Sequence, residues 1–332
     1  MKPINKILSV KLIFFLSSIF LLLIFSYLNY SRNIIVYNEN KKIFYIEKGE
    51  SVTKTIRDLK DSSIISSTLR FKIISYMYNI NPKFISGKYR ISKNDTELSI
   101  LEKFLDGNLY QEKITIIEGS SFKEIIKLLV ENNHINNEKN INFSEPLRKS
   151  SIKFLTNEGM CFPDTYKFSS GTLLKEILIS CSQKMESILL DNWKNRDYSL
   201  PYKSPYEMLI MASIIEKESS DLLEKPLIAS VFINRLRKEM RLQADPTVIY
   251  GIKNFNGNIT KKDLREKNEY NTYKISGLPR TPICSPSESS IRAASRPAES
   301  KFLFFVANNN GKHVFSTNYR DHVNAVNKYQ KK

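Results

Sequence analysis

An apolar segment near the amino terminus limits how this chain can fold and where it can reside. Residues 12–28 read LIFFLSSIFLLLIFSYL, and no charged side chain occurs between Lys11 and Arg32. A helix over residues 12–31 would rise by about 30 Å, the thickness of the hydrocarbon layer of a membrane. A cleaved signal peptide is the alternative, but the apolar run is longer than the core of a signal peptide, and no small-x-small cleavage motif follows it. The sequence therefore predicts an uncleaved transmembrane helix at 12–31.

Charges around this segment predict its orientation. Three lysines precede it, whereas the residues that follow carry a mixture of basic and acidic groups. Because positive charge is retained on the cytoplasmic side, residues 1–11 are expected in the cytoplasm and the remainder outside. This placement argues against DNA or RNA as the natural partner.

The composition is that of a folded protein with two modest domains, since a domain usually spans about 100 to 200 residues. Hydrophobic residues make up 41% of the 332 positions and charged residues 26%. The net charge of +17 would attract an anionic polymer or membrane surface. Lysine, isoleucine and asparagine are frequent throughout the chain, however, which indicates a general compositional drift rather than a dedicated binding patch.

Cysteines and histidines predict neither a disulfide framework nor a metal site. The cysteines are three in number and form no closely spaced pair: Cys161, Cys181 and Cys284. We interpret them as small buried apolar residues. The histidines are scattered as well, at His134, His313 and His322.

The stretch from Lys42 to about Glu118 has the pattern of a small α+β unit. The predicted order is strand, helix, helix, strand, at Ile43–Ile46, Val52–Leu59, Leu69–Tyr78 and Lys88–Ile91. The segment IEKGESVTKTIRDL at 46–59 has an echo in IIEGSSFKEIIKLL at 116–129. Both predict a strand, a glycine turn, a serine cap and a helix, either as a common junction or as a true duplication.

The part from about Lys153 onward is predicted to be mainly helical at first. Helices are expected at Leu173–Leu190, Glu207–Ser219 and Pro226–Leu242. A loop-rich stretch then extends to Pro286. The chain is expected to close with a short helix, two strands joined by an Asn310-Gly311 turn, and a final helix.

Two carboxylates end the predicted helix that follows Pro205. Ser204 and Glu207 form a capping-box pattern with proline at the first helical position, so the start of the helix is well marked. Glu216 and Glu218 lie about 200° apart around the helix axis and cannot act as a pair. Glu218 lies over Ile215, Ile214 and Met211, and such apolar surroundings raise the pKa of a carboxyl group. Glu218 is therefore the candidate general acid; a solvated position at a fraying helix end is the alternative.

Five segments resemble one known family. They are EGMCFPDTYKF at 158–168, MASIIEKESS at 211–220, IASVFINRLRKEMRLQADPTVIYG at 228–251, YNTYKISGLPRTPICSP at 270–286 and HVFSTNYRDH at 313–322. Their order and spacing, with the amino-terminal anchor, are similar to the endolytic murein transglycosylase family (MltG/YceG-like). The resemblance covers nearly all of the chain beyond the apolar segment.

The resemblance implies an α+β protein with a transmembrane helix, a LysM-like module at 40–110 and a catalytic YceG-like domain at 111–332, whose core is about 153–332. It implies a lytic transglycosylase of the inner membrane with its catalytic domain in the periplasm. Such an enzyme breaks the β-1,4 bond between N-acetylmuramic acid and N-acetylglucosamine without water and leaves 1,6-anhydro ends, which terminates growing strands. Peptidoglycan synthases (penicillin-binding proteins) are the implied partners.

The same resemblance places the catalytic carboxylate on Glu218. Polar groups of the matching loops are candidates to bind the substrate and stabilise its developing charge: Gln243, Asp245, Asn271, Tyr273 and Ser276. Asp245 before a proline and Asn271 are also natural turn formers. No cofactor or metal is expected, because no lysine has the context of a Schiff base and no glycine-rich phosphate loop occurs.

Several positions depart from the family pattern. Met160 and Cys161 stand where large aromatic residues are usual, Arg280-Thr281 where Pro-Gly is usual, and Ser285 where asparagine is usual. These leave Glu218 untouched but bear on the shape of the loops. A non-catalytic module that binds the wall and recruits synthases is the competing hypothesis.

Overall fold

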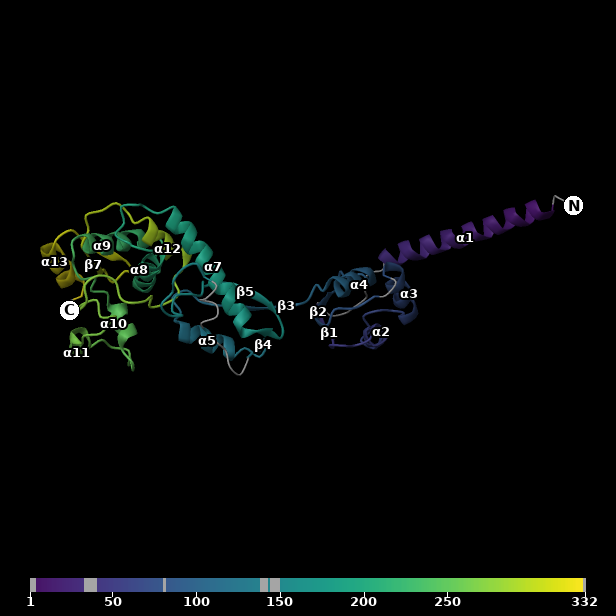
Figure 1. The fold of residues 1–332 in the computed structure, drawn as a ribbon, viewed down its shortest axis with the longest axis horizontal. Coiled ribbons are helices and arrows are strands. Elements are labelled where there is room, and N and C mark those ends of the chain that lie inside the picture. The colour runs from purple at the N-terminus through teal and green to yellow at the C-terminus, as the bar shows by residue number, and fades with distance from the viewer. Residues whose placement is uncertain (1–3, 33–40, 80–81, 138–142, 144–149, 331–332) are drawn as a thin grey trace. The chain divides into compact units, whose positions relative to one another are not determined.

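A computed structural model describes residues 4–32, 41–79, 82–137, 143 and 150–330. The chain divides into two compact units, residues 1–112 and 113–332. Each unit combines helices with short two-stranded sheets (Figure 1), so the predicted α+β class is confirmed.

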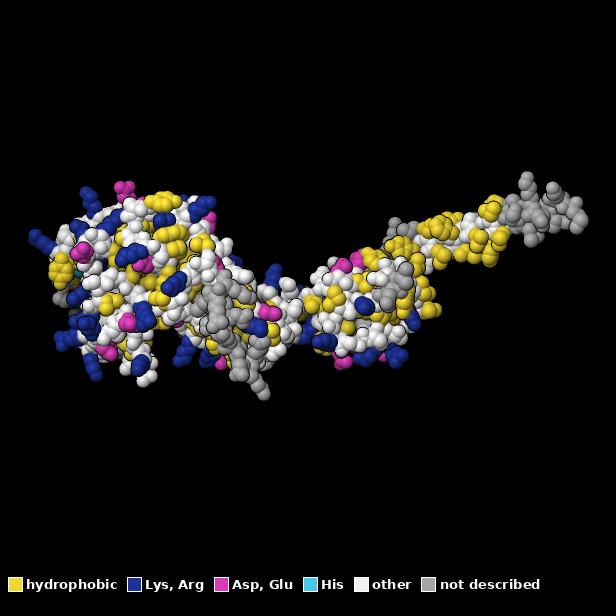
Figure 2. Space-filling model, viewed as in Figure 1, with side chains coloured by type: hydrophobic (Ala, Val, Ile, Leu, Met, Phe, Trp, Pro, Cys, Tyr) yellow, Lys and Arg dark blue, Asp and Glu magenta, His cyan; other side chains and the backbone are white. Residues whose placement is uncertain are grey.

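Helix α1 extends from Ile4 to Arg32, and the side chains of residues 11–27 are described. Its large apolar side chains from Leu12 to Phe25 are exposed, and Figure 2 shows them along the helix. No helix within the described residues combines the length and the apolarity that a membrane crossing requires. The predicted transmembrane helix at 12–31 is therefore not confirmed.

The rest of the first unit follows the predicted order, with one more helix. Strands β1 (Lys41–Ile46) and β2 (Gly87–Ser92) pair antiparallel, with Phe44 opposite Tyr89, and helices α2 (Val52–Asp61) and α3 (Thr68–Tyr78) lie between them in the chain. Helix α4 (Glu97–Asp106) was not predicted; Thr96 caps it and Gly107 ends it in the left-handed conformation. The core gathers around the buried rings of Phe71, Tyr89 and Phe104.

The repeat of the strand-to-helix junction stands at the start of the second unit, and its strand begins two residues before the boundary. Strand β3 (Gln111–Thr115) leads through Gly119, with φ +75°, to helix α5 (Phe122–Val130). Ser121 caps α5 as Ser51 caps α2, so the two predicted junctions are confirmed. Strand β3 pairs with β5 (Thr165–Ser169), and β4 (Ile135–Asn136) pairs in parallel with β6 (Thr172–Leu173).

A group of helices forms the main core of this unit. They are α7 (Leu174–Lys194), α8 (Pro205–Glu218), α9 (Lys225–Arg237), α10 (Asp245–Gly251) and α12 (Glu288–Ser295). Helix α11 (Lys261–Arg265) has no buried residue and lies outside this core. Helices α10 and α11 both fall in the stretch that was predicted to be loop-rich. Helix α8 packs against α7, α9, α10 and α12, which places it at the centre. Ser204 caps α8 as predicted, whereas the Glu207 carboxylate accepts its hydrogen bond from the Lys203 N–H at 2.6 Å.

The chain closes with a hairpin and a helix, as predicted. Strands β7 (Phe304–Ala307) and β8 (His313–Ser316) pair antiparallel, and helix α13 (Tyr319–Tyr329) packs on both strands. The turn between the strands contains Gly311 with φ +73°. This hairpin and helix form part of the wall of the cleft described below.

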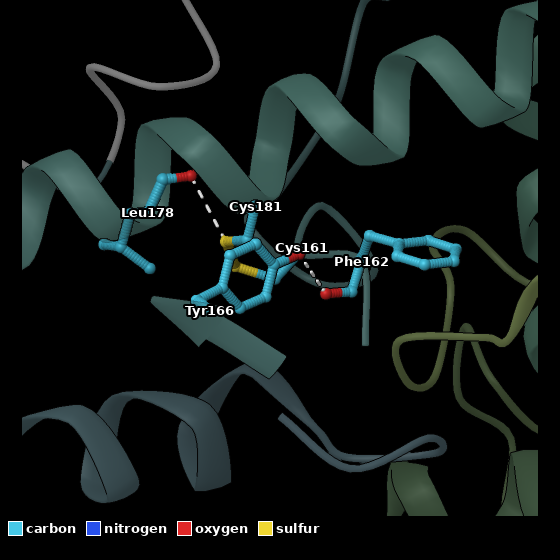
Figure 3. Close-up of a disulfide and its surroundings, with 5 residues drawn as sticks. All are labelled: Cys161, Phe162, Tyr166, Leu178 and Cys181. Atoms are coloured by element: carbon cyan, nitrogen blue, oxygen red, sulfur yellow. Dashed lines mark hydrogen bonds between the residues drawn. A yellow bond between two sulfur atoms is a disulfide. The ribbon is translucent and has the colours of Figure 1, made fainter. Parts of the chain in front are cut away.

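The prediction that the cysteines form no disulfide was wrong. Cys161, in the loop before β5, is bonded to Cys181 on α7, with their Cα atoms 4.7 Å apart (Figure 3). Tyr166 donates a hydrogen bond to the Phe162 carbonyl at 2.6 Å beside this bridge. The two cysteines are 20 residues apart in the sequence, and their pairing depends on how β5 packs against α7, which local sequence patterns do not show. Cys284 is free, and all three side chains are buried, as predicted.

Candidate active site

Helix α8 passes through the buried core, and its last turn carries two carboxylates. Residues 208–215 are all buried, so the helix is enclosed over its central turns. The hydrogen-bonded ladder ends at Glu218, after which Ser219 adopts an extended conformation. The backbone therefore fixes the positions of Glu216 and Glu218 while turning their side chains in different directions.

Glu216 is bound in a polar network beneath the loop that leads to α12. Its Oε2 accepts hydrogen bonds from the Ser287 N–H at 2.9 Å, the Ser287 hydroxyl at 2.5 Å and the Ser290 hydroxyl at 2.6 Å. The buried Lys225 ammonium lies 3.2 Å away. Burial alone would raise the pKa of Glu216, but these hydrogen bonds and the charge of Lys225 hold the pKa below its ordinary value. Glu216 is thus an ionised structural group.

Glu218 has the opposite environment. Its carboxylate accepts no hydrogen bond from any residue that the structure describes, and it faces a cleft. Burial, with the negative charge of Asp245 nearby, raises the pKa of Glu218 to about 8, although the charge of Arg235 opposes the shift. The carboxyl group is therefore mostly protonated at neutral pH, which is the state of a general acid.

The cleft around Glu218 has a volume of about 440 Å³ and is built from four parts of the second unit. These are the end of α8, the residue Arg235 of α9, the loops around 243 and 273, and the closing hairpin with α13. Its lining residues are Glu218, Arg235, Leu242, Gln243, Asp245, Tyr273, Phe304, Phe305, Val306, Ala307, His313, Tyr319, His322, Val326 and Gln330. Three of the five predicted substrate-binding residues, Gln243, Asp245 and Tyr273, therefore share one cleft with Glu218.

Asp245 and Tyr273 are linked directly. The Tyr273 hydroxyl donates a hydrogen bond to Asp245 Oδ1 at 2.6 Å. Burial, followed by this bond, raises the pKa of the Tyr273 phenol, so the ring stays neutral and its hydroxyl keeps its proton. Gln243 lies in the left-handed conformation, with φ +50°, and its N–H donates to the Thr272 carbonyl at 3.2 Å. The two loops thus hold one another.

Asn271 and Ser276 do not line the cleft. Asn271 is fully buried, and its Nδ2 donates to the carbonyl oxygens of Asp263 at 3.0 Å and Glu266 at 2.6 Å. Its Oδ1 accepts from the Tyr273 N–H at 3.0 Å. Asn271 therefore positions the loop that carries Tyr273. Ser276 lies exposed farther along the same loop.

Arg235 is the main site residue that the sequence interpretation missed. Its guanidinium is buried, donating to the Leu242 carbonyl through Nη1 at 2.6 Å and to the Leu303 carbonyl through Nε at 2.7 Å. Leu242 precedes the Gln243–Asp245 loop, and Leu303 precedes β7, so one side chain positions two lining segments. Arg235 lies within the segment 228–251 that resembles the family, but the residues around it in the sequence do not indicate that it binds the carbonyls of Leu242 and Leu303.

His313 and His322 also line the cleft. Their scattered positions in the sequence did not indicate that they would lie together. The His313 Nδ1 lies 2.7 Å from Glu224 Oε2, and its backbone N–H donates to Glu224 Oε1 at 2.8 Å. Burial, with the nearby charge of Arg235, lowers the pKa of His322, so this ring is neutral at neutral pH. No group of three potential metal ligands occurs among the described residues.

Comparisons with known proteins agree with one another. The model of the YceG-like family matches residues 44–328. An endolytic murein transglycosylase of Bacillus subtilis is 31% identical over 302 residues, covering 86% of this chain and 83% of the relative. An endolytic murein transglycosylase of Streptococcus pneumoniae R6 is 30% identical over 188 residues, covering 54% of this chain and 33% of the longer relative. The crystal structure of a yceG-like protein from Listeria monocytogenes is 28% identical with a TM-score of 0.56, covering 86% of this chain and 98% of that one.

Proposed function

The chain belongs to the YceG-like family, and from that premise we propose that it is an endolytic lytic transglycosylase of peptidoglycan, with Glu218 as its acid and base. The substrate is the β-1,4 bond between N-acetylmuramic acid and N-acetylglucosamine. The observation that carries the proposal is a carboxyl group with a pKa of about 8 that faces a cleft and accepts no hydrogen bond from the described residues.

One carboxyl group is sufficient for this reaction. Glu218 donates its proton to the glycosidic oxygen as the bond from that oxygen to C1 of the muramic ring breaks. The resulting carboxylate takes the proton of the same ring's 6-hydroxyl while O6 forms a bond to C1. The products are a free 4-hydroxyl and a 1,6-anhydro ring, Glu218 is protonated again, and no water is consumed.

Arg235 and the Asp245–Tyr273 pair support the two halves of this cycle. Once Glu218 has given up its proton, the nearby positive charge of Arg235 stabilises the carboxylate. Asp245 is the lining carboxylate that lies near enough to Glu218 to raise its pKa. It supplies negative charge to an oxocarbenium-like transition state, and Tyr273 fixes its direction.

A hydrolytic reaction is the second candidate, and Asp245 is the observation that favours it. Hydrolytic glycosidases use two carboxyl groups, one as acid and one as nucleophile or as the base that activates water. Asp245 shares the cleft with Glu218 and would take the second role. The products would then carry reducing ends instead of anhydro rings.

The test is product analysis of intact peptidoglycan strands incubated with the purified protein. Mass spectrometry should find 1,6-anhydro-muramic ends, and Glu218→Gln should produce none while its circular dichroism spectrum remains that of the parent. Reducing ends that disappear in Asp245→Asn would establish the hydrolase instead. A folded protein that releases nothing would support the non-catalytic module.

We also propose that the chain is anchored in the inner membrane by residues 12–31, with its second unit in the periplasm. Support comes from the exposed apolar side chains of α1 and from the Cys161–Cys181 disulfide, since disulfides persist in oxidising compartments. The strand-helix-helix-strand order of β1, α2, α3 and β2 supports a LysM-like, wall-binding role for residues 40–110. A tether beside the membrane would place the enzyme next to the synthases that extend the strands.

A further inference from the structure

The wall of the cleft formed by α13 carries an exposed aromatic ring. Tyr319 is the first residue of α13, lines the same cleft as Glu218, and leaves 68% of its surface exposed. Its hydroxyl makes no hydrogen bond to another described residue. Both a flat ring and a free hydroxyl are therefore presented to whatever fills the cleft.

This ring belongs to an aromatic cluster and is not isolated on the surface. The centroids of Tyr319 and Phe304 are 5.9 Å apart, and those of Phe304 and His322 are 5.1 Å apart with an interplanar angle of 21°. The Arg235 guanidinium lies 5.2 Å from the centre of the Phe304 ring on β7. Arg235, which also positions two segments that line the cleft, therefore contacts this cluster of Tyr319, Phe304 and His322 through Phe304.

The backbone under Tyr319 is fixed as well. Asn318 caps α13, with its Oδ1 accepting from the Asp321 N–H at 3.0 Å. A capped first turn fixes the backbone that carries Tyr319 before any ligand arrives, which reduces the conformational entropy lost on binding.

The chemistry of this wall suits a neutral sugar better than an anion. Tyr319 and Phe304 are uncharged, and His322 is neutral at neutral pH because its pKa is lowered. The faces of sugar rings expose C–H groups that pack on aromatic rings, and sugar hydroxyls bond to a phenol. Val306 and Val326 line the same wall and offer apolar contacts for the methyl group of an N-acetyl substituent.

We propose that Tyr319, supported by Phe304 and His322, forms a sugar-binding subsite that stacks on one N-acetyl sugar of the strand whose bond reaches Glu218. The inference rests on the proposed function, since it names where the strand is held. Tyr319 contributes to binding and takes no part in the proton transfers. Its contact is made in the ground state and in the transition state alike, so its loss should raise KM and leave kcat nearly unchanged.

The experiment compares four forms of the full chain in detergent: the parent, Tyr319→Ala, Tyr319→Phe and Tyr198→Ala. Tyr198 is a matched control, because it is 74% exposed in the same unit and does not line the cleft. Cleavage kinetics give kcat and KM. Binding of uncleaved strands is measured with each tyrosine variant placed in a Glu218→Gln background, where no cleavage interferes.

Tyr319→Ala should weaken strand binding and raise KM by about tenfold, which corresponds to about 1.4 kcal/mol. Tyr319→Phe keeps the ring and should stay within about threefold of the parent, and Tyr198→Ala should match the parent. Unchanged binding and KM in Tyr319→Ala, with the parent active, would overturn the subsite alone. A parent that neither binds nor cleaves strands would overturn the proposed function and the subsite with it.

Discussion

Glu216 and Glu218 are two residues apart on one helix, yet their surroundings give them opposite states. Glu216 meets hydroxyls, an N–H and an ammonium, which stabilise its charge. Glu218 meets a cleft in which burial disfavours its charge. One helix therefore presents Glu216 as an ionised structural group and Glu218, about half a turn farther on, as a neutral acid.

The acid state of Glu218 predicts the pH dependence of cleavage. The reaction requires the protonated carboxyl group, and its pKa is about 8. We expect the rate to be nearly constant between about pH 6 and 7 and to fall about tenfold per unit well above pH 8. Initial rates of strand cleavage from pH 5 to 10 measure this, and a rate that rises through pH 8 would contradict the role of Glu218 as the acid.

The structural state of Glu216 predicts a loss of stability when its charge is removed. In Glu216→Gln the ammonium of Lys225, which is only 2% exposed, would stay buried without its counter-charge. We expect the free energy of unfolding to fall by about 3 kcal/mol. Urea denaturation followed by circular dichroism measures the change.

Glu218→Gln is the matched control for that experiment, because it makes the same chemical change two residues away. It should be at least as stable as the parent at neutral pH, because the raised pKa of Glu218 means that its ionisation in the unfolded chain opposes folding, and it should lose strand cleavage. If the two variants lose the same stability, the distinction drawn between the two carboxylates is wrong.

At the scale of elements, the disulfide joins the loop before β5 to helix α7 and closes a chain segment with a sequence separation of 20. The double variant Cys161→Ala, Cys181→Ala should have a free energy of unfolding about 3 kcal/mol lower than the parent, because its unfolded chain regains the conformational freedom of that loop. Denaturation curves without reductant measure it.

Cys284→Ala is the control, since Cys284 is buried but unbonded and its replacement should cost about 1 kcal/mol or less. Thiol counting provides an independent check. The denatured parent should react at one thiol without reductant and at three after reduction. Three reactive thiols before reduction would show that the bridge does not form.

Local sequence patterns predicted the longer helices, missed α4, α10 and α11, and gave little information on long-range partners. The start of α8 could be predicted because Ser204, Pro205 and Glu207 are a local signal, and helical phase singled out Glu218. The partners of Arg235, at Leu242 and Leu303, depend on how three segments pack, which no periodicity encodes. The Cys161–Cys181 bridge and the histidines of the cleft were missed for the same reason.

At the level of the whole molecule, the proposed membrane anchor predicts where the protein is recovered. The full chain should sediment with membranes and require detergent for release, whereas a chain without residues 1–31 should be released by a neutral buffer wash. Fractionation with immunoblotting measures this. Protease added to spheroplasts should digest the second unit of the full chain, and protection of that unit would contradict the proposed periplasmic location.

Arg235 combines an electrostatic and a structural property in one side chain. Its guanidinium supplies the positive charge that Glu218 experiences, and it also holds the carbonyls before two lining segments. A substitution that removes the charge also frees the Gln243 loop and the first strand of the hairpin. At this position the pKa of Glu218 and the width of the cleft therefore cannot be engineered independently. A variant that changes the charge of residue 235 also needs new contacts to hold the two lining segments in place.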